Sequence, residues 1–119
     1  MIAAKKKRMP GFKFALNGLL HTIKNEKNFR IHLIIVLTVV IAGLYFNVTT
    51  TEWLLLFASI GIVLMSELIN TSIELLVDLV SPESNEKAGL IKDIAAAAVL
   101  TAALIAIIIG LIIFIPYVI

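Results

Sequence analysis

The sequence contains no cysteine and only three prolines among its 119 residues. Without cysteine, the chain can form neither a disulfide nor a thiolate metal site. Charged residues are also scarce at 15%, whereas hydrophobic residues make up 61%. A soluble domain of this size could not bury so much apolar surface, but a bilayer would act as the solvent for its outer faces. We therefore expect a single integral membrane domain over residues 1–119.

Basic residues are absent from most of the chain. All ten Lys and Arg lie between Lys5 and Arg30 or at Lys87 and Lys92. Because basic residues collect on the cytoplasmic side of a membrane, the N-terminus and the segment that holds Lys87 and Lys92 are predicted to be cytoplasmic, with the C-terminus outside. No apolar segment directly follows the basic residues 5–8, so residues 1–10 are expected to form a loose arm of the mature chain rather than a signal peptide.

Hydrophobic periodicity predicts four helical segments and an all-α membrane fold. Residues 11–25 alternate apolar and polar side chains at helical spacing, which is typical of an amphipathic helix on the membrane surface. A helix packed on a partner helix is the alternative. Residues 29–46, 53–80 and 88–115 are apolar enough to span the bilayer, the first with help from flanking residues. Four aromatic residues fall at the predicted outer ends, as in an interfacial belt: Tyr45, Phe46, Trp53 and Tyr117.

Polar residues form a stripe on the second predicted span. Glu67, Asn70, Glu74 and Asp78 fall within an arc of about 80° on a helix. Charges inside a span are costly, so this stripe must face protein, water or an ion rather than lipid. Glu67 lies about 21 Å from Trp53 along the helix, which places it beneath the cytoplasmic headgroups of a core about 30 Å thick. A lipid alcohol would present its hydroxyl at about that depth.

Further charged residues are expected at the same end of the bundle, where Glu26, Lys92 and Asp93 flank the predicted spans. Carboxylates from separate helices can hold Mg²⁺ together with phosphate oxygens. This set suits phosphoryl transfer, with Glu67 as the base because it is the deepest and least solvated acid. The sequence lacks both G-x-x-x-x-G-K-[ST] and G-x-G-x-x-G, so neither a P-loop nor a protein-kinase site is expected.

Other interpretations of these polar residues remain open. The stripe could be structural, through hydrogen bonds between helices, or it could conduct protons or cations as part of a transporter or channel. A non-catalytic interaction subunit is a third interpretation. His21 and His32 share no metal-ligand spacing and are interpreted as interfacial, and Arg30 is expected to extend to the lipid headgroups. A packing face of small residues is predicted at Ala95–Ala98.

Three motifs carry a resemblance to a known family. They are Glu67-Leu-Ile-Asn-Thr-Ser-Ile-Glu-Leu-Leu-Val-Asp78, Lys92-Asp-Ile-Ala-Ala-Ala-Ala-Val99 and Asn25-Glu-Lys-Asn-Phe-Arg-Ile-His32. In this order and at these separations they resemble the prokaryotic diacylglycerol kinase family, which includes diacylglycerol kinases and undecaprenol kinases. The resemblance covers nearly the whole chain. It implies a homotrimer in the bacterial inner membrane, with sites between subunits, that uses ATP and Mg²⁺ to phosphorylate a membrane lipid alcohol and binds no nucleic acid.

The resemblance also implies roles for single residues. Glu67 would be the catalytic base with Asn70 beside it, and Glu26 and Glu74 would bind the metal. The ATP-binding residues would be Glu26, Glu74, Glu83, Asn85, Lys92 and Asp93, supported by Asp78. The residues expected to bind the lipid substrate are Glu67, Arg30, Trp53 and Ala96. The chain departs from many family members at Ser84-Asn85, where they carry Tyr-His, and at Phe14, where some carry Tyr.

Overall fold

The computed structural model describes residues 11–119, and the predicted basic arm at residues 1–10 lies outside the described residues. Over this range the chain forms helices and loops without any strand. The helices are α2 (Gly11–Asn25), α3 (Lys27–Phe46), α4 (Thr50–Val80) and α5 (Glu86–Val118). The expectation of an all-α fold is therefore confirmed.

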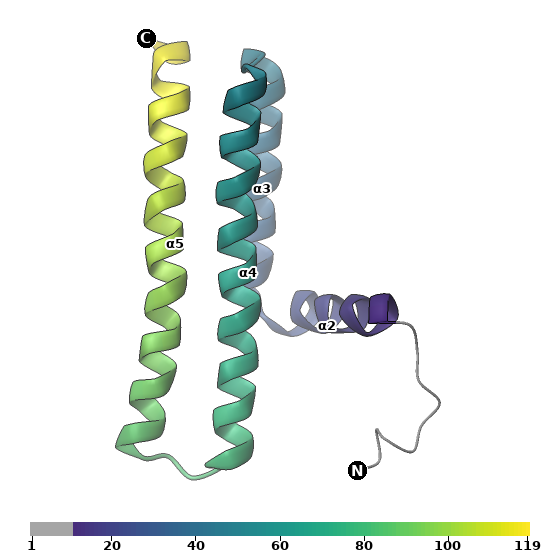
Figure 1. The fold of residues 1–119 in the computed structure, drawn as a ribbon, viewed down its shortest axis with the longest axis vertical. Coiled ribbons are helices and arrows are strands. Elements are labelled where there is room, and N and C mark those ends of the chain that lie inside the picture. The colour runs from purple at the N-terminus through teal and green to yellow at the C-terminus, as the bar shows by residue number, and fades with distance from the viewer. Residues whose placement is uncertain (1–10) are drawn as a thin grey trace.

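Three of these helices are long and apolar enough to cross a membrane: α3, α4 and α5. They run side by side, whereas α2 lies crosswise at the N-terminal end of α3 and points away from the bundle (Figure 1). Each of the three begins two or three residues before the predicted position. The side chains of Thr49 and Asn85 cap α4 and α5, whereas Glu26 precedes α3 without a side-chain capping hydrogen bond. Only Thr22 of α2 is buried, and the position of α2 on a membrane surface stays a prediction.

A tight turn joins α3 to α4. Asn47 adopts a left-handed conformation with φ of 55°, and its backbone N–H donates to the carbonyl of Leu44 at 3.3 Å. Thr49 then begins α4 with a capping box, in which the Glu52 N–H donates to the Thr49 hydroxyl and Glu52 accepts from the Thr49 N–H. The Tyr117 hydroxyl also donates to Glu52, which ties the end of α5 to the start of α4.

The small buried core lies at this same end of the bundle, which we call the turn end. Val48, Leu56 and Ile113 are its buried members, and Phe46 and Trp53 are among the side chains that pack against them. Most other large apolar side chains of α3, α4 and α5 are exposed. In a membrane these side chains meet lipid or other subunits, so the fold does not depend on a large core within one chain. The opposite end, with residues 81–85, is called the loop end.

Candidate active site

The polar stripe of α4 enters the protein interior as the sequence predicts. Only 3% of Glu67 and 9% of Asn70 is exposed, whereas Asp78 near the end of α4 is exposed. The structure also buries Thr71, which the sequence analysis did not single out. The Asn70 Oδ1 and the Thr71 Oγ1 atoms have no hydrogen-bond partner over residues 11–119. Buried polar atoms of this kind are costly when unpaired, so both are available to a ligand or a neighbouring subunit.

His32 on α3 faces Glu67 on α4. The His32 Nε2 atom lies 3.6 Å from the Glu67 Oε2 atom, and 20% of the His32 side chain is exposed. The sequence analysis did not predict this contact, and the interfacial position expected for His32 stays a prediction. The helical period places His32 near the start of a span, but it does not show which helix the ring faces.

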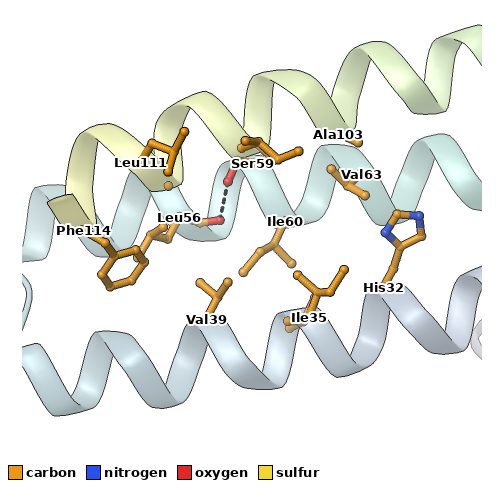
Figure 2. Close-up of a pocket in the computed structure, with 14 residues that line it drawn as sticks. His32, Ile35, Val39, Leu56, Ser59, Ile60, Val63, Ala103, Leu111 and Phe114 are labelled. Atoms are coloured by element: carbon orange, nitrogen blue, oxygen red, sulfur yellow. Dashed lines mark hydrogen bonds between the residues drawn. The ribbon is translucent and has the colours of Figure 1, made fainter.

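An apolar groove leads from His32 toward the turn end. It has a volume of about 350 Å³ and is lined by α3, α4 and α5. Figure 2 shows His32 at one end of the groove and Phe114 toward the other. Ser59 also lines it, but its hydroxyl donates to the Leu56 carbonyl at 2.9 Å. The groove therefore offers an apolar chain a continuous surface, with its polar groups gathered at the His32 end.

Carboxylates converge around Glu74, which lies about three helical turns along α4 from Val63 of the groove. Glu26, Glu67 and Asp78 lie near enough for their negative charges to act on Glu74, and so does the positive charge of Lys92. Glu26 precedes the first residue of α3, and its side chain makes no capping hydrogen bond there. Its carboxylate is therefore available for another ligand.

The Glu26 and Glu74 carboxylates fit the expected magnesium site. Both residues are half-buried and come from different helical segments. Over residues 11–119, no group of three or more His, Asp or Glu side chains is arranged to hold an ion. A pair of carboxylates without a complete protein cage is the arrangement that Mg²⁺ uses when phosphate oxygens and water supply its other ligands.

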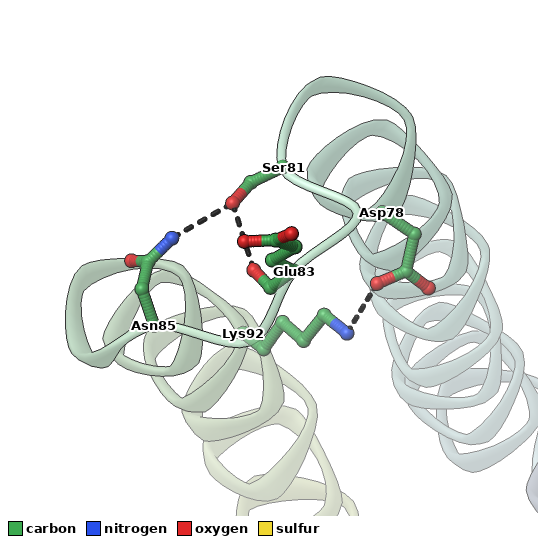
Figure 3. A network of polar contacts seen from close by, with 5 residues as sticks. All are labelled: Asp78, Ser81, Glu83, Asn85 and Lys92. Atoms are coloured by element: carbon green, nitrogen blue, oxygen red, sulfur yellow. Dashed lines mark hydrogen bonds and ion pairs between the residues drawn. The ribbon is translucent and has the colours of Figure 1, made fainter.

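A polar pocket of about 210 Å³ lies at the loop end, between α4 and α5. Glu83, Asn85 and Lys92, three of the predicted ATP-binding residues, line it together with Asp78 and Ser81 (Figure 3).

Hydrogen bonds fix the shape of this loop pocket. The Lys92 Nζ atom lies 2.6 Å from the Asp78 Oδ1 atom, and the Asn85 Nδ2 atom donates to the Ser81 hydroxyl at 2.7 Å. The Asn85 Oδ1 atom accepts from the Ala88 N–H at 2.8 Å and so caps α5. Asp78 thus holds the lysine at the pocket, and the supporting role expected for Asp78 stays a prediction.

The other predicted site residues lie outside these two cavities. The Arg30 Nη1 atom donates to the carbonyls of Ile23 and Lys24 at 2.8 and 3.0 Å. Its guanidinium thus caps the last turn of α2, a contact that the sequence analysis did not predict, and the expected extension to the headgroups stays a prediction. Trp53 packs on Gly43 at the turn end.

Asp93 and Ala96 are exposed on α5 and line neither cavity. The binding roles of Arg30, Trp53, Asp93 and Ala96 stay predictions.

Comparison with known proteins shows that the chain is similar in sequence to diacylglycerol kinases and undecaprenol kinases. A family model described as prokaryotic diacylglycerol kinase matches residues 13–114. The chain is 39% identical over 105 residues to a protein of Bacillus subtilis named undecaprenol kinase, and the match covers 88% of this chain and 85% of that protein. It is 35% identical to a diacylglycerol kinase of Synechocystis sp., over 83% of this chain and 57% of that protein. It is 34% identical to a diacylglycerol kinase of Escherichia coli K12, over 80% and 78% respectively.

Proposed function

Because the chain belongs to the prokaryotic diacylglycerol kinase family, we propose that it transfers the γ-phosphate of ATP to the hydroxyl of a membrane lipid in a Mg²⁺-dependent reaction. The first candidate substrate is diacylglycerol, because the Synechocystis and E. coli relatives are named diacylglycerol kinases. Undecaprenol is the second. It is favoured by the higher identity to the B. subtilis relative and by a groove with almost no polar lining, which suits a hydrocarbon chain without ester groups.

One observation carries the proposal: a buried carboxylate lies beside the end of an apolar groove. Glu67 is 3% exposed, and His32, its neighbour, lines the groove. A lipid whose chain occupies the groove brings its hydroxyl to this carboxylate. Glu67 accepts the hydroxyl proton, the oxygen forms a bond to the γ-phosphorus, and ADP leaves.

Residues at the loop end would hold the nucleotide. Lys92, fixed by Asp78, places a positive charge at the mouth of the loop pocket, where it can meet phosphate oxygens. Glu26 and Glu74 would hold Mg²⁺, which neutralises phosphate charge when bound. Glu74 lies between Glu67 and Asp78 along α4, so Mg²⁺ held there would lie between the base and the loop pocket.

We further propose a homotrimer in the bacterial inner membrane, with the N-terminus in the cytoplasm, the C-terminus outside and each site completed by a second subunit. The small core at the turn end and the exposed apolar faces of α3 and α5 support an assembly of several chains. The unpaired atoms of Asn70 and Thr71 also fit a site that one chain leaves incomplete.

The test is transfer of radiolabelled phosphate from ATP to diacylglycerol and to undecaprenol, side by side in mixed micelles. Glu67→Gln keeps the shape of the side chain but removes the base, so activity should fall by about 100-fold or more. Glu52→Gln is the matched control. It lies on the same helix at the turn end, and glutamine preserves its capping box. Size-exclusion chromatography of both variants checks that the oligomer is intact.

Three results would contradict the proposal in different ways. Full activity of Glu67→Gln would remove Glu67 as the base, and a fully active monomer in detergent would remove the trimer. Ion flux through liposomes without consumption of ATP would instead favour a channel or transporter subunit. The ratio of the two lipid activities decides between the two substrates.

A further inference from the structure

His32 contacts both the proposed base and the proposed lipid groove. Its Nε2 atom lies 3.6 Å from the Glu67 Oε2 atom, and it is one of the residues that line the groove. Figure 2 shows the ring projecting from α3 at the end of the groove, beyond Ile35 and close to Val63. The imidazole therefore lies beside the Glu67 carboxylate and at the end of the groove.

Few other groups can orient the Glu67 carboxylate. Over residues 11–119, the carboxylate forms no hydrogen bond, and His32 is the only basic side chain within ion-pair distance. Two other basic residues near this end of the bundle, Lys92 and Arg30, bind other partners. Lys92 pairs with Asp78, and Arg30 binds carbonyl groups of α2. The orientation of the Glu67 carboxylate thus depends on a single polar neighbour.

A buried base needs such a neighbour for two reasons. A buried carboxylate that lacks a polar partner is costly. A base must also present its oxygen within about 3 Å of the proton that it accepts, because small errors in position slow the reaction. The 3.6 Å separation is longer than a hydrogen bond, but hydrogen bonds at catalytic sites often shorten only when substrate binds.

We propose that His32 is a positioning residue for Glu67. Its Nε2–H group donates to one carboxylate oxygen, so the other oxygen is directed to the hydroxyl of the lipid in the groove. The inference rests on the proposed function, because it takes Glu67 as the base. His32 forms no bond to lipid or phosphate. The hydroxyl proton passes to Glu67, the hydroxyl oxygen bonds to phosphorus, and ADP is the leaving group.

The chain offers a matched control, because it contains only one other histidine, His21. His21 is exposed on α2, where its ring lies 3.3 Å from the Asn25 amide nitrogen. His32→Ala should lower kcat by about 100-fold, while the KM for lipid changes by less than about threefold, as expected when an interaction acts mainly in the transition state. His21→Ala should leave both constants unchanged.

Two further variants separate positioning from packing. His32→Gln keeps an N–H donor that can reach the carboxylate, so it should recover most of the lost kcat. His32→Phe fills the same space without a donor and should be as slow as His32→Ala. If His32 only packs against α4, phenylalanine would restore kcat better than glutamine, and that result would overturn the inference.

A spectroscopic measurement tests the contact without relying on catalysis. With two histidines in the chain, the ring ¹⁵N resonances are assigned by one substitution each. Glu67→Gln should shift the Nε2 resonance of His32 and leave that of His21 in place. An unchanged His32 resonance, or a wild-type kcat in His32→Ala, overturns the inference while the kinase proposal stands. A wild-type chain that phosphorylates neither lipid refutes the proposed function, and the positioning role fails with it.

Discussion

Replacement of Gly43 by alanine tests the packing of α3 on α4 at the turn end. A Cβ atom at residue 43 would lie 2.9 Å from both the Cζ2 and the Cζ3 atoms of Trp53, and nearer still to Cη2. Carbon atoms normally approach to about 3.5–4.0 Å, so the indole would have to retreat by about 1 Å. Its retreat is hindered because Trp53 stacks on Phe57, with ring centroids 5.2 Å apart and planes inclined by 15°.

The size of the effect follows from a comparison with a second glycine. Forced overpacking costs about 1–3 kcal/mol, while alanine gains about 1 kcal/mol over glycine in a helix. Gly61 lies on α4 with nothing within 4 Å of an added Cβ atom, so Gly61→Ala makes the same gain without the clash. The gain in helix propensity is the same in both variants, so it cancels when they are compared. The free energy of unfolding of Gly43→Ala should therefore be about 1–3 kcal/mol lower than that of Gly61→Ala.

The assay is unfolding in detergent micelles by titration with a denaturing detergent. The chain has a single tryptophan, so intrinsic fluorescence reports directly on the Trp53 ring that must move. The position of Glu67 should be unaffected, because Trp53 lies about 21 Å from it along α4. Equal stability of the two alanine variants would refute the packing argument.

Two more predictions concern the loop end. Glu74→Gln removes one of the two carboxylates expected to hold Mg²⁺, so the Mg²⁺ concentration for half-maximal activity should rise by about tenfold or more, which is a loss of at least about 1.4 kcal/mol in binding. A Mg²⁺ titration checks this, with Glu52→Gln as the control, and an unchanged midpoint would exclude Glu74 as a ligand. Asn85→Ala removes the cap of α5 and should lower the free energy of unfolding by about 1 kcal/mol, whereas Asn85→Ser should restore most of it. Thermal unfolding followed by circular dichroism measures both, and equal loss in the two variants would exclude the capping role.

The helices could be predicted because each depends on a local pattern. Ser81 and Pro82 end the second span where the sequence indicates a break, and α4 ends at Val80. Burial of Glu67 and Asn70 follows from the helical period and from the cost of exposing such groups to lipid. The predicted first residues of the three spans lie two or three residues after the observed ones. Hydropathy does not detect capping residues such as Asn85, which precede the apolar part of a helix.

The contacts between helices could not be predicted in the same way. α5 is apolar around most of its circumference, so its sequence does not indicate which face meets α4. Arg30 and His32 illustrate the consequence. Both lie in a recognisable motif, yet the motif does not show that one caps α2 and the other faces Glu67. Their partners depend on the angle between α2 and α3 and on the rotation of α3 against α4.

The amino-acid sequence by itself determined that this protein has three segments long and apolar enough to span a membrane, a polar stripe on the second of them and a set of acids at one end. Those features follow from the cost of placing each residue in lipid and from the 3.6-residue period, which act within a single helix. Only the tertiary structure decided that His32 meets Glu67, that an apolar groove ends there, and that Lys92 is held by Asp78. These contacts depend on the relative rotation and register of whole helices, which no local pattern encodes.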